Sequence, residues 1–186
     1  TTSASESGTT ANELNMVTGG AVDTTDLFTD RDLEQTADLS EAKTYTVSDG
    51  QTIEITSEGV YVITGSASNA SIIVEAGDED KVQLVLDGVT ITNDSIPCIY
   101  VKSADKVFVT TTDSENSLSV TGTFTADGDT NTDAVIFSKD DLVLNGVGTL
   151  NIQSSDNGVT CKDDMKITGG TINIACEADA LEANDS

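Results

Sequence analysis

A short repeat near the C-terminal end limits this chain to a small set of folds. Residues 138–142, SKDDL, return as residues 161–165, CKDDM, and residues 148–152, GTLNI, return as residues 170–174, GTINI. The offsets are 23 and 22 residues, a period typical of solenoid proteins, in which each repeat packs only against its neighbours. A third copy begins at 178–185 and the sequence stops inside it, so we expect the chain to be a fragment.

The repeat unit is expected to consist of short β-strands. Its apolar residues alternate with polar residues, and no apolar residues recur at helical spacing. The next copy keeps this register, which places Met165 beneath Leu142 and Ile172 beneath Leu150, with a corner at 145–146. Three strands in about 22 residues form one coil of a parallel β-helix, so the sequence predicts an all-β solenoid.

Composition divides the chain into two parts. Residues 1–25 are rich in Ser and Thr and predict a disordered tether, whereas residues 26–186 form the predicted solenoid domain, truncated at its C-terminal end. Leucines and a phenylalanine between acidic residues at 26–39 predict a short cap over the open first coil. Residues 121–132 interrupt the repeat and predict an inserted loop, since insertions in solenoids gather on one face.

The charge of the chain restricts its partners. Thirty-three acidic residues against eight basic ones give a formal net charge of −25. Such a chain cannot neutralise phosphates, which excludes nucleic acid and an anionic membrane surface. No apolar run is long enough for a transmembrane helix. A Ser/Thr-rich start fits a secreted protein, so we expect an extracellular or cell-surface location.

Residue types that are missing or rare exclude several chemistries. The chain has no histidine, which excludes Ser-His-Asp triads and histidine-ligated zinc sites. Tryptophan is absent and only three tyrosines and four phenylalanines occur, so no stacking platform for neutral sugars is expected. Cys98, Cys161 and Cys176 lack metal-site spacing. We expect Cys161 to be a small buried thiol, with a Cys161–Cys176 disulfide as the alternative.

The repeated corner gathers carboxylates. Stacked coils are expected to place aspartates in two rows, in which successive aspartates of one row lie about 4.8 Å apart. Asp140, Asp163 and Asp185 form one row, and Asp141 and Asp164 form the other. Carboxylates this close repel unless a cation intervenes, and oxygen ligands without thiolate or imidazole favour calcium. Alternatively, these aspartates cap turns through backbone N–H groups while the neighbouring lysines neutralise them.

A second acidic group lies in the inserted loop. Asp127, Asp129, Asn131 and Asp133 alternate with other residues, as oxygen ligands do at the start of an EF-hand loop. Thr132 stands where an EF-hand requires glycine, so the segment is not an EF-hand. It predicts either a looser calcium loop or a solvated surface loop.

Outward-facing polar residues of the repeat are candidates for glycan binding. They form a flat strip of hydrogen-bonding groups, and two lysines lie beside it at the repeated corner. These candidates are Thr149, Asn151, Thr171, Asn173, Lys139 and Lys162. The strip fits a solvated sheet face equally well.

Four segments, 99–107, 134–142, 157–171 and 183–186, together resemble the carbohydrate-binding parallel β-helix family of anaerobic bacteria. The resemblance covers roughly residue 26 to the end of the chain. It implies a right-handed β-helix, secreted or lipid-anchored, similar in shape to family 9 pectate lyases. It also implies binding of plant cell-wall polysaccharide, both cellulose and acidic pectic chains, with calcium held by aspartates. On this chain those aspartates are Asp140, Asp141, Asp163, Asp164 and Asp185.

The sequence therefore favours an extracellular, calcium-dependent module that binds acidic polysaccharide. A chain of charge −25 repels polygalacturonate unless calcium bridges carboxylate to carboxylate. One alternative is a pectate-lyase-like enzyme with Lys139 or Lys162 as the base, although flanking carboxylates favour a protonated lysine. Another is a structural fibre made of β-helices stacked end to end.

Overall fold

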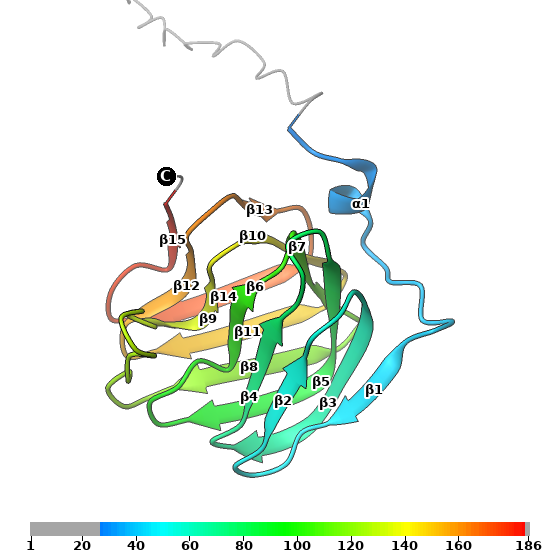
Figure 1. Ribbon diagram of the computed structural model, residues 1–186. Helices are drawn as coiled ribbons and strands as arrows, with labels where there is room; N and C mark the ends of the chain where they lie inside the picture. Colours follow the sequence, from blue (N-terminus) through cyan, green and yellow to red (C-terminus); the bar gives the residue numbers. More distant parts are fainter. Residues whose placement is uncertain (1–26, 185–186) are drawn as a thin grey trace, which may run out of the picture.

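The protein is an all-β structure whose sheets curl around a common core (Figure 1). The computed structural model describes residues 27–184, so the predicted tether and Asp185 lie outside the described residues. All pairings between its named strands are parallel. The all-β prediction is confirmed.

One sheet, called sheet B below, has six strands in the order β15-β12-β9-β6-β4-β2. Its strands are β2 (Thr52–Ile55), β4 (Ser71–Glu75), β6 (Ile99–Ser103), β9 (Ala134–Ser138), β12 (Asn157–Cys161) and β15 (Leu181–Ala183). Neighbours in this sheet are separated along the chain by strands of the other sheet. The chain therefore alternates between the two sheets as it advances along the core.

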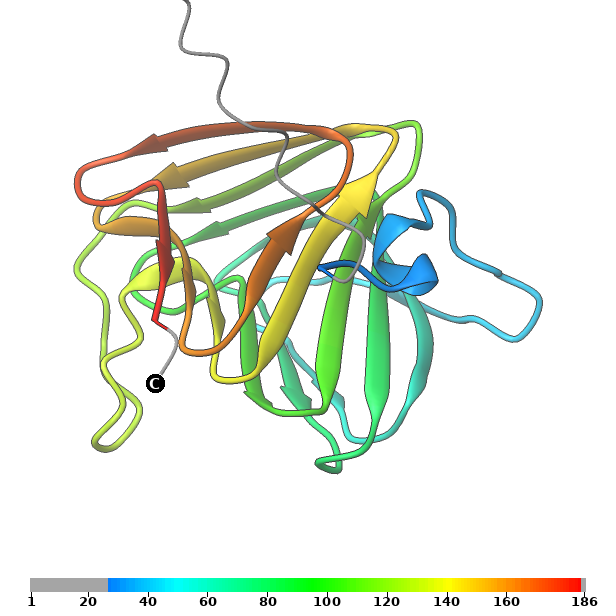
Figure 2. The ribbon, with the colours of Figure 1, turned by 90° about the horizontal axis from the view of Figure 1, so that it is seen from above.

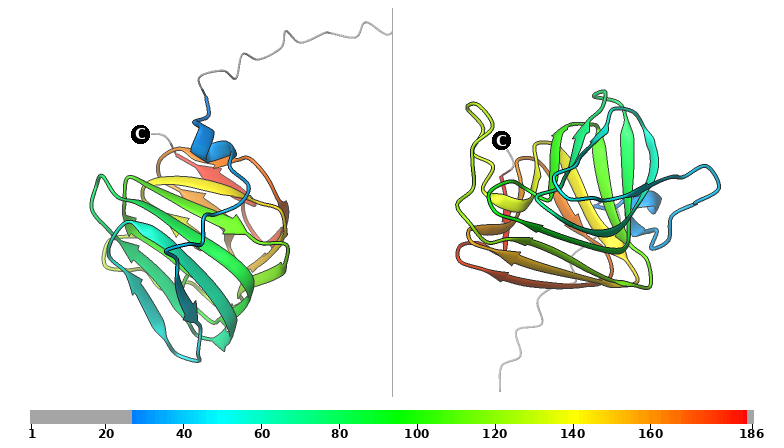
Figure 3. Two further views of the ribbon diagram at one scale, coloured as in Figure 1. Left: turned by 90° about the vertical axis from the view of Figure 1, so that its right-hand side faces the viewer. Right: turned by 90° about the horizontal axis from the view of Figure 1, so that it is seen from below.

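The other sheet, sheet A, has nine strands and covers two faces of the core (Figure 3). They are β1 (Lys43–Thr46), β3 (Gly59–Ser68), β5 (Lys81–Asn93), β7 (Lys106–Thr111), β8 (Glu115–Val120), β10 (Asp141–Gly146), β11 (Thr149–Ser154), β13 (Met165–Ile167) and β14 (Thr171–Cys176). Strand β5 pairs with β7 through 81–86 and with β8 through 90–93. Gly88 has φ +69° between these two parts, a conformation that glycine adopts without strain. Strand β5 thus turns a corner within one element. In later coils the same corner separates two strands, such as β7 and β8.

The register predicted from the repeat is the register of the sheets. Leu142 pairs with Met165, and Leu150 pairs with Ile172. The predicted corner contains Gly146 at φ +116°, and a Cβ there would lie 2.3 Å from the carbonyl oxygen of Thr111. Only glycine allows the two backbones to approach this closely.

Stacked side chains of like kind form the core. Ile72, Ile99, Ile136 and Val159 are successive partners in sheet B, and none of them is exposed. Each such side chain contributes about 1.5–3 kcal/mol through burial. Burial declines in the last strands, where the pattern of β14 alternates between exposed and half-buried.

The segment before β1 packs on the outside of sheet A. Its helix α1 (Asp30–Leu33) lies against β10, and the Arg31 guanidinium carbon sits 4.7 Å from the ring centre of Phe108 in β7 (Figure 2). The predicted position over the open first coil is therefore wrong. The segment instead contacts the outward side of β7 and β10, where Arg31 lies over Phe108 and Asn145 donates to the Glu34 carbonyl oxygen at 2.9 Å. Within residues 27–184 no helix has the length and apolar character that crossing a membrane requires.

All three cysteines are free thiols. Cys98 and Cys161 are fully buried, which confirms the prediction of a small buried thiol at 161. The Cys161–Cys176 disulfide is wrong. The two residues lie on different sheets, in β12 and β14. The Cys161 thiol donates a hydrogen bond to the Asp140 carbonyl oxygen, and the Cys176 thiol donates to that of Ala178.

Candidate functional site

The outer face of sheet B carries two adjacent aromatic side chains. Tyr100 in β6 pairs with Phe137 in β9, and their rings pack edge to face with centres 5.7 Å apart. Alternation along each strand turns these rings outward, because Val101 and Ser138, the next residues, are buried against the core. Tyr100 and Phe137 are nevertheless only 4% and 0% exposed, so other groups cover this outward pair.

A row of three lysines lies beside the aromatic pair. Lys102 in β6, Lys139 directly after β9 and Lys162 directly after β12 occupy equivalent places in successive coils, two positions after Tyr100, Phe137 and Thr160. This set, the lysine row, stacks at the strand spacing of about 4.8 Å. Its ammonium groups lie over aromatic rings: Lys102 and Lys139 are 5.2 and 5.9 Å from the Tyr100 ring centre, and Lys162 is 5.7 Å from that of Phe137. At these distances the ring faces attract the cations.

The insertion loop, residues 121–133, stands beside this face (yellow-green in Figure 2). Tyr100 donates its hydroxyl hydrogen to Asp127 at 3.2 Å, and Lys102 Nζ lies 3.0 Å from the same carboxylate. These hydrogen bonds, the one from Lys102 first, hold the pKa of Asp127 below its usual range. The pKa of Lys102 is raised, chiefly by the same contact. The loop is thus attached to the lysine row through one carboxylate.

Two hollows flank the loop. One, of about 300 Å³, has a largely apolar floor that includes Ile73, Pro97 and Tyr100. The other, of about 480 Å³, lies beyond the loop and combines both signs of charge. Its lining residues are Asp129, Thr130, Asn131, Asp133, Phe137, Lys139 and Lys162. The face therefore carries a cationic row, with a largely apolar hollow on one side of the loop and a polar, charged hollow on the other.

The last lysine of the row meets an acceptor from the next strand. Lys162 Nζ is 3.6 Å from Glu182, which also accepts hydrogen bonds from Asn157 at 2.8 Å and Asn184 at 2.6 Å. Hydrogen bonding, first of all from Asn184, lowers the pKa of Glu182. Lys139 differs from its two neighbours, since no carboxylate of residues 27–184 lies within 4.0 Å of its ammonium group.

The corner acids, Asp140, Asp141, Asp163 and Asp164, lie on the stacked turns that the sequence predicts. Burial, followed by the nearby Asp163, Asp78 and Asp141 charges, raises the pKa of Asp140 despite a hydrogen bond from the Ala104 N–H. Burial also raises the pKa of Asp141, although Lys106 lies 3.4 Å away.

No three acidic or thiol side chains among residues 27–184 are grouped so as to hold a metal by themselves. Asp163 and Asp164 are exposed, and Asp185 lies outside the described residues. The corner is therefore an open acidic turn. That its aspartates cap turns, and that they form part of a calcium site, both remain predictions.

The three predicted ligands of the loop do not converge. Asp127 points to Lys102, whereas Asp133 accepts hydrogen bonds from Asn131 at 2.9 Å and Thr160 at 3.2 Å. Asp129 is exposed at the edge of the larger hollow. Asp127 and Asp133 thus serve as hydrogen-bond acceptors toward the sheet.

The polar strip, Thr149, Asn151, Thr171 and Asn173, is assembled as predicted. Thr149 pairs with Thr171, and Asn151 pairs with Asn173. Asn173 donates to the Asn151 side chain at 2.9 Å, and Asn151 donates in turn to Glu115 at 2.9 Å. The side-chain amides thus form hydrogen bonds with their neighbours along the strip, as expected for a solvated sheet face.

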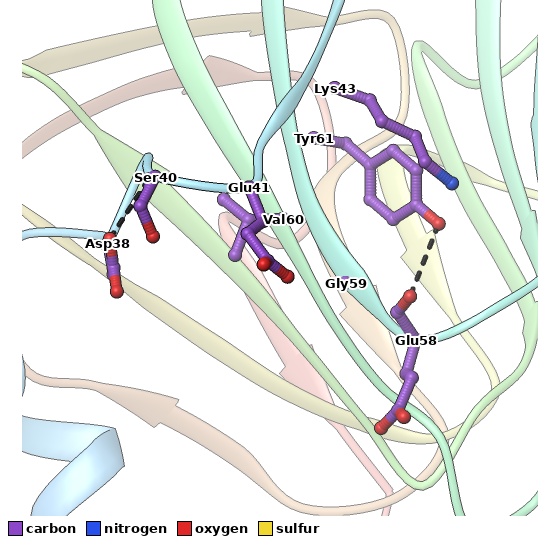
Figure 4. Close-up of a pocket in the computed structure, with 8 residues that line it drawn as sticks. All are labelled: Asp38, Ser40, Glu41, Lys43, Glu58, Gly59, Val60 and Tyr61. Atoms are coloured by element: carbon purple, nitrogen blue, oxygen red, sulfur yellow. Dashed lines mark hydrogen bonds between the residues drawn. The ribbon is translucent and has the colours of Figure 1, made fainter.

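A further hollow of about 450 Å³ lies between residues 38–43 and β3 (Figure 4). Lys43 lies over the ring of Tyr61 at 5.4 Å, and the Tyr61 hydroxyl donates to backbone carbonyl oxygens at Ser57 and Glu58. The lining carboxylates lie apart from one another in Figure 4, and the Asp38 carboxylate accepts from the Ser40 N–H. This hollow gathers no convergent groups.

Sequence reasoning missed Lys102, Tyr100 and Phe137 as parts of a site. A signal was present, because lysine follows two residues after Tyr100, Phe137 and Thr160 in three successive coils. The separation between the first two of these coils includes the inserted loop. That loop hides the periodicity of the row.

Comparison with known proteins identifies a family and a shared fold. A family model described as carbohydrate-binding domain-containing protein matches residues 49–186. A protein of the same name from Acetivibrio thermocellus is 36% identical over 126 residues, covering 66% of this chain and 44% of the relative. The chain thus spans less than half the length of that relative.

A solved structure shares the fold. The structure of the polysaccharide lyase-like protein from C. thermocellum, a gadolinium derivative, superimposes with a TM-score of 0.58. It is 20% identical and covers 77% of this chain and 94% of the solved chain. At this identity the likeness concerns the fold.

Proposed function

The chain belongs to the family of carbohydrate-binding domain-containing proteins, and from that premise we propose that it binds polysaccharide on the outer face of sheet B. The observation that carries the proposal is the lysine row beside Tyr100 and Phe137, flanked by two hollows. Three of the eight basic residues of the chain lie in this one row, and this concentration of positive charge marks a surface suited to anionic sugar.

We propose acidic plant cell-wall polysaccharide, of the pectic type, as the ligand, with cellulosic chains as a further ligand. Uronate carboxylates would form ion pairs with the ammonium groups of the lysine row. Sugar hydroxyl groups would donate to the carboxylate and amide oxygens of the larger hollow beside it. The polar strip on sheet A offers a second surface, where Thr149 and Asn151 continue as Thr171 and Asn173 in the next coil, with the Glu115 carboxylate beside Asn151.

Calcium is part of the proposal because of the corner acids. Calcium takes six to eight oxygen ligands, and the corner offers fewer than a closed site needs. The raised pKa values of Asp140 and Asp141 express unrelieved burial and like-charge repulsion, which a divalent cation would relieve. Carboxylates and hydroxyl groups of a bound glycan would supply the remaining oxygens. Calcium bound there would join glycan to protein.

For the fold we propose a right-handed parallel β-helix. Partners 22 residues apart, such as Leu150 and Ile172, support a coil of about that size at the C-terminal end. Earlier partners are further apart, 27 residues from Ile72 to Ile99 and 37 residues from Ile99 to Ile136. The longer coils carry the long corner of β5 and the insertion loop. Similarity to family 9 pectate lyases stays a prediction.

Binding without catalysis fits the relatives, which are named for carbohydrate binding, while the solved neighbour is named only lyase-like. The base suggested for a lyase does not gain support at Lys162, because its amine is already paired with the Glu182 carboxylate at 3.6 Å. An extracellular location, a lipid anchor and end-to-end assembly stay predictions of the sequence.

Calorimetric titration tests the proposed function. Polygalacturonate, its fully methyl-esterified form and soluble cello-oligosaccharides are titrated into the protein in calcium and in EDTA. Binding to at least one glycan is expected, with the acidic polymer favoured and its affinity lowered in EDTA. Absence of binding to all three would refute the function, whereas equal affinity in calcium and EDTA would refute only the role of calcium.

A further inference from the structure

Three stacked ammonium groups are unfavourable unless negative charge faces them. Lysines in neighbouring strands lie about 4.8 Å apart and repel one another, as like charges directly opposite do in any sheet. Asp127 faces Lys102 and Glu182 faces Lys162, but the central Lys139 has no carboxylate of residues 27–184 within 4.0 Å. The middle of the row is thus a place where an external anion can pair with an ammonium group, in a hollow that Asp129 and Asp133 also line.

The site already binds one carboxylate, that of Asp127. The Lys102 ammonium group at 3.0 Å and the Tyr100 hydroxyl at 3.2 Å both donate to it, which is the pair of donors a uronate group would use. The Asp127 side chain is 52% exposed and comes from a short turn closed by backbone bonds between Asp127 and Thr130. An exposed ion pair contributes little to stability, so a ligand can displace this carboxylate at small cost.

We propose that Asp127 is an internal substitute for a ligand carboxylate, and that the insertion loop competes with acidic polysaccharide for the lysine row. In the free protein Asp127 occupies the Lys102–Tyr100 end of the row. In the complex a uronate carboxylate replaces it there, and a neighbouring sugar reaches Lys139. This inference rests on the proposed function and assigns Lys102 and Lys139 as the residues that select acidic over neutral polymer.

The two key variants have effects of opposite sign. Lys139→Gln removes a cation that has no carboxylate of residues 27–184 within 4.0 Å, and it is expected to weaken polygalacturonate binding about tenfold or more. Asp127→Asn removes the competing charge while keeping the shape, and is expected to strengthen binding about two- to fivefold. Lys81→Gln and Asp113→Asn make the same charge changes elsewhere and serve as matched controls. A misfolded protein cannot produce the gain expected for Asp127→Asn.

Calorimetric titration of these four variants with polygalacturonate and with its methyl ester tests this inference. The buffer, with calcium or with EDTA, is the one in which the wild-type protein binds. The expected result is a loss for Lys139→Gln and a gain for Asp127→Asn, both confined to the acidic polymer. If both match their controls, or if wild type binds the methyl ester equally well, the inference is overturned while the proposed function stands. If wild type binds neither polymer nor cello-oligosaccharides, both fail.

Discussion

Substitution of Asp32 by alanine should release the segment that packs on sheet A. Asp32 is completely buried, and its carboxylate accepts from the Thr29 N–H at 2.9 Å. The same carboxylate lies 3.4 Å from Lys106 Nζ and 3.6 Å from Lys166 Nζ. Burial opposes its ionisation, but these hydrogen bonds and charges outweigh burial and lower the pKa. Asp32 is thus ionised at neutral pH and joins α1 to β7 and β13.

The expected cost follows from the interactions that the Asp32 carboxylate makes. The capping-box hydrogen bond contributes about 1 kcal/mol, and hydrogen bonds to a charged partner contribute about 1.5–3 kcal/mol. Lys106 keeps Asp141 at 3.4 Å, so it does not become an unpaired buried charge. We therefore expect about 2–4 kcal/mol in total. This cost falls on the docking of the segment, since the core strands keep their own packing.

Limited trypsin digestion measures this release at Arg31, which is held over Phe108 while the segment is docked. When cleavage follows the open population, a destabilisation of about 2 kcal/mol raises its rate about thirtyfold. Asp30→Ala is the matched control, because Asp30 is an exposed aspartate in the same helix and flanks the same cleavage site. Equal cleavage rates for the two variants would show that Asp32 does not hold the segment.

Three further outcomes are expected. Gly146→Ala should destabilise the fold by about 1–3 kcal/mol, because its Cβ would lie 2.3 Å from the Thr111 carbonyl oxygen; an unchanged melting temperature would contradict the corner geometry. Burial raises the pKa of Cys98 to about 12 and of Cys161 to about 11, so iodoacetamide at pH 8 should label only Cys176 before denaturation; mass spectrometry counts the labels, and modification of more than one native thiol would contradict this. The raised pKa values of Asp140 and Asp141 mean that protonation of these two carboxylates favours the folded state, so in EDTA the melting temperature should rise as pH falls from 7 to about 4.5, and calcium should abolish this rise; identical pH profiles with and without calcium would exclude calcium binding there.

Local pattern was sufficient for the C-terminal coils. Strand side chains alternate with period two, so an exact repeat requires that equivalent residues stack. Met165 beneath Leu142, Ile172 beneath Leu150 and the corner at Gly146 all follow from that rule. The polar strip on the outer side of the same strands follows with them, because one register fixes both faces.

Only the tertiary structure decided where the non-repeating segments lie. The position of α1 depends on Asp32 meeting Lys106 and Lys166, partners more than 70 residues away in the chain, and no local pattern encodes such a pairing. The insertion loop is likewise held by contacts between distant segments: Asp127 meets Lys102 and Tyr100 at one end of the lysine row, and Asp133 accepts from Thr160. By itself the sequence determined which side chains stack, since strand geometry is local and periodic. Tertiary structure decided what covers those stacks, because docking depends on complementary charge and shape between segments that are distant in sequence.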